Sequence, residues 1–376
     1  MNRKNILLVQ LYSNGDCLYA TAVARQIKID FPDCKLTWAI ARFCKSIIAN
    51  NPDIDEVIEV NEVKKNDVVA FRKYKRKILR EKKKELWDEV FITQNMDDNL
   101  KFYDGTIRGM VLRAYPFPVA NIQPKLKLYE QEKENVKAFA EKYSLERFKN
   151  VILWEYAPQS GQANLSFDFV MNVAKKITAL PDTCVILTSA NKFSSTEKII
   201  DASELSVREN AELTHYCNLF IGCSSGITWL NTSNAGKQLP MLQLLNPNTD
   251  FRNILSEDCK RYGLPTDNLI ELFDFNEQNV SDCVKSFFNE GVNITRKNFN
   301  QPLPLSFNTS RKIVYNLLCY LNLKGIIQHI RIMKSIYGNN AELNRQLSFG
   351  IAEFPVKLAR NTFNKKILPL FSRQKK

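Results

Sequence analysis

The chain has 376 residues, which is enough for two domains with separate cores. Its 44% hydrophobic and 25% charged residues are typical of a folded protein and exclude extensive disorder. The net charge of +13 is concentrated in residues 311–376, which carry 13 Lys and Arg against only Glu342 and Glu353. The rest of the chain is nearly neutral, which argues against nucleic acid as a partner.

The cysteines and histidines argue against a disulfide framework and a metal site. None of the nine cysteines belongs to a Cys-x-x-Cys pair, and several lie in apolar runs typical of buried free thiols. His215 and His329 are the only histidines, so zinc has almost no candidate ligands. No apolar stretch approaches the roughly 18 residues of a membrane-spanning helix. We therefore expect a reduced, cytoplasmic protein that needs no metal or other cofactor.

Strands and helices alternate in the first third of the chain. Residues 6–10 form an apolar run between polar turn residues, which predicts a strand buried on both faces. The pattern continues with strands at 35–40, 56–60 and 89–93 and helices at 17–31, 43–49 and 64–84. This order predicts a parallel sheet covered by helices.

The helix predicted at 64–84 is strongly basic, with 11 Lys and Arg against Asp67 and Glu81. Apolar residues interrupt the charges at Val68, Val69, Phe71, Ile78 and Leu79. Two interpretations remain open, namely the solvated face of an amphipathic helix and a patch that faces a polyanion.

The alternation restarts after a proline-rich stretch and a charged helix at 130–143. We expect strands at 151–155, 184–189, 219–222 and 241–245, with helices at 167–180, 207–216, from 227, and at 282–289. These patterns predict an α/β protein with an N-terminal Rossmann-like domain (1–125), a C-terminal Rossmann-like domain (126–300) and a basic, largely helical C-terminal extension (301–376).

The carboxyl ends of the first strands carry the candidate functional residues, because ligands of open α/β sheets bind there. Asp16 follows the first strand and precedes the first helix, within the loop Ser13, Asn14, Gly15. Gly15 permits a tight turn and leaves room for a substrate beside the carboxylate. The alternative is that Asp16 is a simple helix N-cap.

Two further loops follow strands of the second half and are predicted to line the same cleft. The first carries small and hydroxyl residues that suit a diphosphate, at Ser224, Ser225, Gly226, Ile227 and Thr228. It is not a Walker loop, since no Gly-Lys-Ser/Thr follows, and a well-capped buried helix is the alternative. The second loop, residues 157–166, contains Ser160 and Gln162.

Several segments in order resemble the lipopolysaccharide heptosyltransferase family, which are glycosyltransferases of GT-B fold. The resemblance spans roughly residues 5–290 and is carried by residues 5–28, 31–38, 51–58, 87–90 and 206–230. It implies two Rossmann-like domains facing across a cleft. It also implies inverting, metal-independent transfer of a sugar from a nucleotide donor, typically ADP-heptose, to a lipopolysaccharide, lipid-linked or cell-surface glycan.

The resemblance also implies roles for individual residues. Asp16 matches the general base of the family, and the loop from Ser224 to Thr228 matches its donor-phosphate site, while residues 13–15 are assigned to the acceptor side. The family usually has an acid where Ser224 stands and a histidine where Trp229 stands, and an expected lysine is missing near Gln162. The donor could therefore be ADP-heptose or another nucleotide sugar.

Two other functions are compatible with these patterns. One is a sugar-nucleotide epimerase of GT-B fold, although such sites usually need several acids and histidines, and the chain has two histidines. The other is a catalytically inactive, membrane-associated glycan-binding protein that has retained the fold. Binding of a nucleotide diphosphate would distinguish the two enzymes from the inactive glycan-binding protein.

The basic C-terminal extension is predicted to lie on anionic lipid at the inner face of the cytoplasmic membrane. Its charges are interleaved with apolar residues at Phe349, Phe354, Phe363, Ile367, Leu368, Leu370 and Phe371. The alternative is a helix packed back across both domains with solvated charges, and we favour this alternative for residues 311–325.

Overall fold

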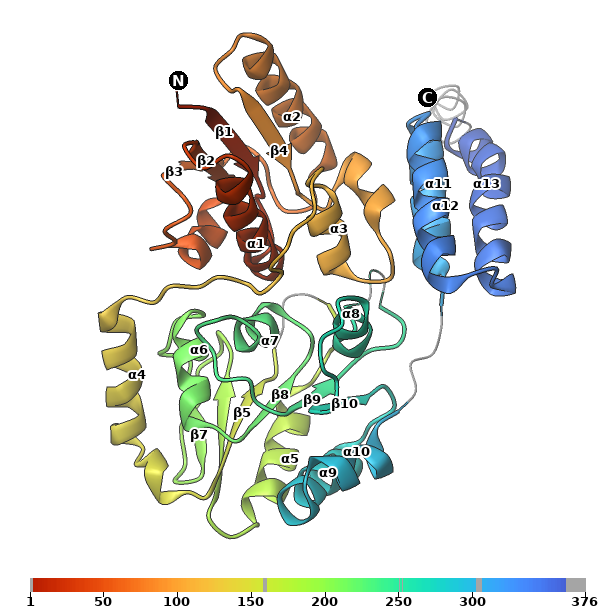
Figure 1. The fold of residues 1–376 in the computed structure, drawn as a ribbon. Helices are drawn as coiled ribbons and strands as arrows, with labels where there is room; N and C mark the ends of the chain where they lie inside the picture. The colour runs from red at the N-terminus through yellow and green to blue at the C-terminus, as the bar shows by residue number, and fades with distance from the viewer. Residues whose placement is uncertain (1–2, 158–160, 250, 252, 302–305, 363–376) are drawn as a thin grey trace, which may run out of the picture.

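The computed structural model describes residues 3–157, 161–249, 251, 253–301 and 306–362, with side chains described as far as Pro355. Two α/β domains lie one above the other, and a helical bundle stands beside the N-terminal domain (Figure 1). Eight of the nine cysteines are buried, and Cys319 is exposed.

The N-terminal domain is built on a four-stranded parallel sheet with the order β3-β2-β1-β4. Its strands are β1 (Asn5–Val9), β2 (Lys35–Ile40), β3 (Glu56–Glu59) and β4 (Glu89–Ile92). Its helices are α1 (Asn14–Asp30), η1 (a 3₁₀ helix, Arg42–Ile48), α2 (Val68–Lys83), η2 (3₁₀, Asp97–Phe102) and α3 (Ile107–Arg113). Residues 6–9 of the central strand β1 are fully buried, as the apolar run predicted.

The C-terminal domain has a six-stranded parallel sheet in the doubly wound order β10-β9-β8-β5-β6-β7. Its strands are β5 (Asn150–Glu155), β6 (Thr183–Thr188), β7 (Ile199–Asp201), β8 (Leu219–Gly222), β9 (Met241–Leu244) and β10 (Leu269–Leu272). Its helices are α4 (Glu130–Lys142), η3 (3₁₀, Leu145–Arg147), α5 (Phe167–Thr178), α6 (Glu209–Leu213), η4 (3₁₀, Thr214–Tyr216), α7 (Gly226–Asn231), α8 (Leu255–Arg261), α9 (Glu277–Glu290) and α10 (Val292–Phe299). The predicted α/β alternation is confirmed.

Some boundaries differ from the sequence prediction. The helix expected at 282–289 begins five residues earlier, at Glu277, because the Asn276 side chain accepts hydrogen bonds from the backbone N–H groups of Gln278 and Asn279. It is followed by α10 and so does not close the domain. The helix expected at 207–216 is divided into α6 and the 3₁₀ turn η4. Strands β7 and β10 have only three and four residues and were not predicted.

The two domains share an apolar core where α1 meets α7. Tyr19 of α1 and Trp229 of α7 are both about 1% exposed and pack edge to face, with ring centroids 4.8 Å apart. The guanidinium of Arg108 lies 5.1 Å from each of these two rings and forms a buried 3.0 Å ion pair with Asp258 of α8. This contact holds the first turns of α1 and α7 in fixed proximity.

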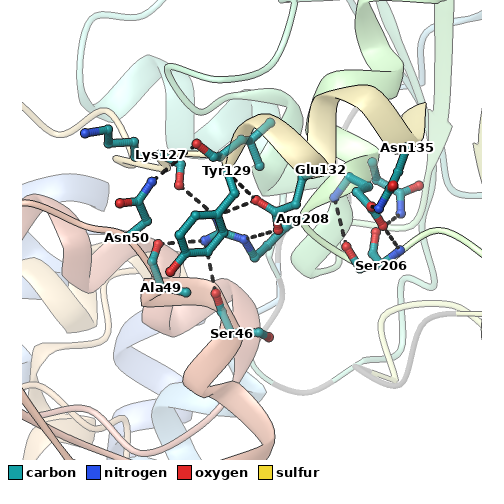
Figure 2. A network of polar contacts seen from close by, with 12 residues as sticks. Ser46, Ala49, Asn50, Lys127, Tyr129, Glu132, Asn135, Ser206 and Arg208 are labelled. Atoms are coloured by element: carbon teal, nitrogen blue, oxygen red, sulfur yellow. Dashed lines mark hydrogen bonds and ion pairs between the residues drawn. The ribbon is translucent and has the colours of Figure 1, made fainter. Parts of the chain in front are cut away.

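A second contact between the domains is polar and centres on Arg208, next to α6 (Figure 2). Its guanidinium donates to Glu132 of α4 at 2.7 Å and to the carbonyl of Lys127, in the segment before α4, at 2.7 Å. It also donates to the carbonyls of Ser46 in η1 and of Ala49 directly after η1, at 3.1 and 2.9 Å. With only 3% of Arg208 exposed, these bonds are shielded from water.

The C-terminal extension forms a bundle of three helices, α11 (Asn308–Cys319), α12 (Leu323–Tyr337) and α13 (Ala341–Thr362). The bundle packs on η2 and α3 through an apolar cluster that includes Tyr103 and Met110 of the N-terminal domain and Ile313, Leu317 and Met333 of the bundle. Phe251 of the C-terminal domain also stacks on Tyr103, at 5.4 Å. The interpretation that 311–325 packs back across both domains therefore fits α11.

Membrane contact of the last residues lies outside this description, because residues 363–376 are not among those that the structure describes. Within the described part of the chain, no helix has the length and apolar character needed to cross a bilayer.

Candidate functional site

The predicted loops of the two domains meet at a cavity of about 420 Å³. Its wall on the N-terminal side includes Ser13, Asn14 and Gly15, which follow β1. Its wall on the C-terminal side includes the residues from Ser225 to Ile227, which follow β8, together with Glu155 at the end of β5. Both sheets thus direct the carboxyl ends of their central strands at one space.

Glycines allow the two loops to touch. A Cβ placed on Gly226 would lie 3.2 Å from Cβ of Asn14 and 3.4 Å from the backbone nitrogen of Gly15. A Cβ on Gly15 would lie 3.4 Å from Cδ1 of Trp229. Trp229 therefore packs against the start of α1 and is buried.

Asp16 lies in the first turn of α1 with its carboxyl group buried, directly after the cavity-lining residues 13–15, but it is not itself among the residues that line the cavity. The N-cap is Ser13. Asp16 is the third residue of the helix, and its carboxylate accepts a hydrogen bond from the backbone N–H of Ser13, so it contributes to the capping of α1 from this position. Burial raises the pKa of its carboxyl to about 6, although a hydrogen bond from the Ser13 backbone acts in the opposite direction. A contact with the Asn95 side chain and the positive charge of Lys65 also favour the ionised form. Such a carboxylate is ionised at neutral pH and is a stronger base than an exposed aspartate.

Lys65 is an exposed cation of the cavity wall and belongs to the loop before α2. The helix that follows buries Phe71, Tyr74 and Ile78 and exposes most of its charges, as expected of an amphipathic helix. Lys65 thus lines the cavity, while the charges of α2 lie mostly on an exposed helix face, which is compatible with both interpretations of the basic run.

The hydroxyl groups of the second loop have separate partners. Ser225 is the N-cap of α7 and accepts a hydrogen bond from the N–H of Ile227 at 3.2 Å. The Thr228 hydroxyl accepts from the N–H of Ser225 at 3.3 Å and is fully buried. Both features fit the well-capped helix that was the alternative to a diphosphate site, but residues 225–227 still line the cavity.

Ser224, which the sequence analysis assigned to the donor diphosphate, does not line the cavity. Its hydroxyl donates to the carbonyl of Asn253, and its N–H donates to Oε1 of Gln243 at 2.9 Å. Its φ is +51°, and only 2% of the residue is exposed. Because its hydroxyl is already bonded within the domain, Ser224 shapes the loop, and its assignment as a donor-binding residue has no support from the geometry.

Gln162, in the third predicted loop, is hydrogen-bonded to another loop of the C-terminal domain. Oε1 of Gln162 accepts from the N–H of Asn253 at 3.2 Å, and its amide nitrogen donates to the carbonyl of Phe251 at 3.2 Å. Gln162 is not among the described residues that line the cavity. Its geometry therefore fits a contact between two loops rather than donor binding. Ser160 lies outside the described residues.

Glu155 is a site residue that the sequence analysis did not single out. It is 4% exposed, and it accepts a hydrogen bond from the Ser225 hydroxyl. Burial raises the pKa of its carboxyl to about 7, although hydrogen bonds from Ser225 and Thr228 favour its ionised form. The signal in the sequence was an acid at the end of an otherwise apolar strand, but only the pairing of β5 with β8 places it under the second loop.

A metal site is not evident in the described part of the chain. No group of three or more His, Cys, Asp or Glu residues is arranged there to hold a metal ion.

Comparison with solved structures identifies the fold. The structure is similar to a glycosyl transferase family 9 protein from Veillonella parvula, with a TM-score of 0.52, 16% identity and coverage of 85% of this chain and 98% of that one. It is also similar to the E. coli ADP-heptose lps heptosyltransferase II, with a TM-score of 0.50, 14% identity and coverage of 78% and 99%. No protein-family model matches the sequence, and no curated protein matches it.

These neighbours are glycosyltransferases, which is the class that the sequence resemblance implied. They align over almost their entire length, so both domains and the cleft between them are shared. The chain therefore has the GT-B fold, with two Rossmann-like domains facing across a cleft and a helical C-terminal extension.

Proposed function

We propose that the protein is an inverting glycosyltransferase. It moves a heptose or hexose-type sugar from a nucleotide-sugar donor to a lipopolysaccharide, lipid-linked or cell-surface glycan. The observation that carries this proposal is the position of Asp16, a carboxylate of raised pKa that directly follows the cavity-lining residues Ser13, Asn14 and Gly15 at the point where the loops of both domains meet.

The geometry supports a single displacement. Asp16 takes the proton from the acceptor hydroxyl, whose oxygen attacks the anomeric carbon of the donor sugar. The bond between that carbon and the diphosphate breaks, and the nucleoside diphosphate leaves with the electron pair. Attack opposite to the leaving group inverts the configuration of the sugar. The donor diphosphate lies against Ser225, Gly226 and Ile227, and the acceptor lies beside Ser13, Asn14 and Gly15.

The donor is a nucleotide sugar whose base and sugar the cavity does not specify. One structural neighbour is named for ADP-heptose, which makes ADP-heptose the first donor to test. The chain lacks the acid and the histidine that the related family places at positions 224 and 229, so UDP- and GDP-sugars are tested beside it.

The protein acts at the inner face of the cytoplasmic membrane, where a lipid-linked acceptor is presented. This part of the proposal rests on the charge of residues 311–376, which carry 13 Lys and Arg against two acids. Attraction to an anionic surface contributes about 1 kcal/mol per basic residue close to it.

A thermal-shift screen against ADP-, UDP- and GDP-sugars tests the proposal. We expect one nucleotide class to raise the melting temperature, since a ligand that binds only the folded state stabilises it. Incubation of that donor with candidate acceptors should then release the nucleoside diphosphate and form a glycoside. Conversion of the donor into an epimeric nucleotide sugar would indicate the epimerase, and no stabilisation by any donor would support an inactive glycan-binding protein.

A further inference from the structure

The turn between α11 and α12 exposes a group of large apolar side chains. Leu321 is 79% exposed, Leu323 is 61% exposed, and Ile327 is 51% exposed. Leu323 and Ile327 are four residues apart in α12 and therefore lie on one face of the helix. Tyr320, which is 50% exposed, adjoins them at the end of α11. We call Tyr320, Leu321, Leu323 and Ile327 the apolar turn.

The conformation of the turn is costly for the folded chain in water. Leu321 has φ +53°, a left-handed conformation that costs a non-glycine residue roughly 1–2 kcal/mol. Glycine or asparagine would adopt this backbone more readily and would not expose a leucine. Leu321 ends α11 in this conformation, with the N–H of Asn322 bonded to the carbonyl of Leu317, and its exposed side chain contributes little to the stability of the bundle.

The surroundings of the apolar turn are mostly basic, although Oδ1 of Asp98 accepts a hydrogen bond from the Asn322 side chain at 3.3 Å. Lys324, Arg331 and Lys334 of α12 are all exposed, and the chain has no Asp or Glu between Arg311 and Ala341. Arg331 continues the helix face of Leu323 and Ile327 by another four residues. The exposed face of α12 is thus apolar at the turn and positively charged farther along the helix.

The basic helix α2 adjoins this surface. The guanidinium of Arg72 in α2 lies 3.5 Å from the ring centroid of Tyr320. Exposed cations continue along α2 at Lys73, Arg76, Lys77 and Arg80. The structure gives these four no ion pair with any carboxylate of the described residues.

We propose that the apolar turn and the exposed face of α12 form the surface through which the protein docks on an anionic lipid bilayer. Apolar side chains that enter the interface and basic side chains that remain at the headgroups are the combination that such a surface requires. A second copy of this chain would bring like charges together. The docking surface belongs to the bundle on the N-terminal domain, which is the acceptor side in the proposed function.

This surface rests on the proposed function only for the lipid-linked acceptor. Its test needs neither donor nor acceptor. The full-length protein is sedimented with vesicles of phosphatidylcholine alone and of phosphatidylcholine with phosphatidylglycerol. We expect binding only to the anionic vesicles, with weaker binding at high salt because the headgroup attraction is screened. Failure of the wild-type protein to bind anionic vesicles would overturn the inference.

The decisive variant is the triple substitution Leu321→Ser, Leu323→Ser and Ile327→Ser. Its matched control is Ile29→Ser, Leu264→Ser and Ile294→Ser, which removes three exposed apolar side chains elsewhere. We expect the turn variant to lose at least tenfold in vesicle partitioning, while the control binds as the wild type does. Equal binding by the turn variant and the control would refute the inference.

Two further measurements distinguish the apolar turn from an anchor in the last residues and from a dimer interface. Deletion of residues 363–376 leaves the apolar turn intact, and we expect the shortened protein to retain binding that depends on Leu321. Loss of all binding in that deletion would assign the anchor to the last residues instead. Size-exclusion chromatography checks self-association, and a wild-type dimer that becomes monomeric in the turn variant would also contradict the inference. The thermal-shift screen with nucleotide sugars reports on the donor site independently of these results.

Discussion

Two carboxyl groups have raised pKa values, one in each domain: Glu155 lines the cavity, and Asp16 directly follows the cavity-lining residues 13–15. Asp16 adjoins the predicted acceptor loop, and Glu155 bonds to the second loop through Ser225. Burial is the main cause of both shifts, and groups tuned in this way are common where proton transfer or charge recognition takes place. The two residues can be tested separately because their conservative amides preserve size and most hydrogen bonds.

Replacing Asp16 with asparagine tests the general base. Asparagine can occupy the same space but cannot accept the proton of the acceptor hydroxyl, so we expect turnover to fall by roughly 100-fold or more. Donor affinity should change little, because the diphosphate is assigned to the loop of α7. Steady-state kinetics and donor titration of the purified variant check both parts. Undiminished turnover would remove Asp16 from this role.

Glu155→Gln tests the buried acid through the pH dependence of stability. The pKa of Glu155 is raised to about 7 in the folded state, so the folded protein holds a proton there that the unfolded chain has released. The resulting stabilisation is present at acidic pH and is lost as pH rises through 7. We expect the glutamine variant to be less sensitive to pH between 5 and 8, by on the order of 1 kcal/mol. Denaturation curves at several pH values measure this, and parallel curves for both proteins would contradict it.

At the scale of elements, the sequence predicted the strands that carry the site but not all of their neighbours. The apolar runs of β1, β5 and β8 end at polar loops, and parallel order brings those ends together. Strand β7 has only three residues, too few to show a pattern, and β10, α3 and α8 were not recognised. Ser224 and Gln162 were assigned to the donor because nothing local reveals that Asn253 bonds to both.

Arg208 links elements of both domains and provides a test of their packing. Arg208→Met would leave Glu132 and the carbonyls of η1 without their donor, so we expect the free energy of unfolding to fall by about 3 kcal/mol. Lys133→Met is a suitable control, since it breaks only an exposed ion pair with Glu130 and should leave the free energy of unfolding almost unchanged. Chemical denaturation of both variants measures the difference. Similar losses in the two variants would show that the Arg208 contacts add little.

At the scale of the whole molecule, the C-terminal extension is divided into a packed bundle and a terminal segment. Leu343 and Leu347 of α13 are buried against the bundle core, so a deletion that begins before α13 would expose that core. The prediction of a lipid-binding tail was made from basic residues interleaved with apolar ones, a pattern that does not separate residues packed in the bundle from those of the terminal segment. The exposed apolar residues at the start of α12 place the proposed lipid contact at the apolar turn instead of the last residues.

The central claim is that the cleft between the domains binds a nucleotide sugar against the loop of α7. Isothermal titration calorimetry of the wild type and Gly226→Val with ADP-, UDP- and GDP-sugars tests it most directly. A valine side chain at 226 would crowd Asn14 and the cavity wall, since even its Cβ would lie 3.2 Å from Cβ of Asn14. We expect one donor class to bind the wild type and to bind the folded variant at least tenfold more weakly. Equal affinity for both proteins, or no binding of any of these sugars to the wild type, would contradict the account.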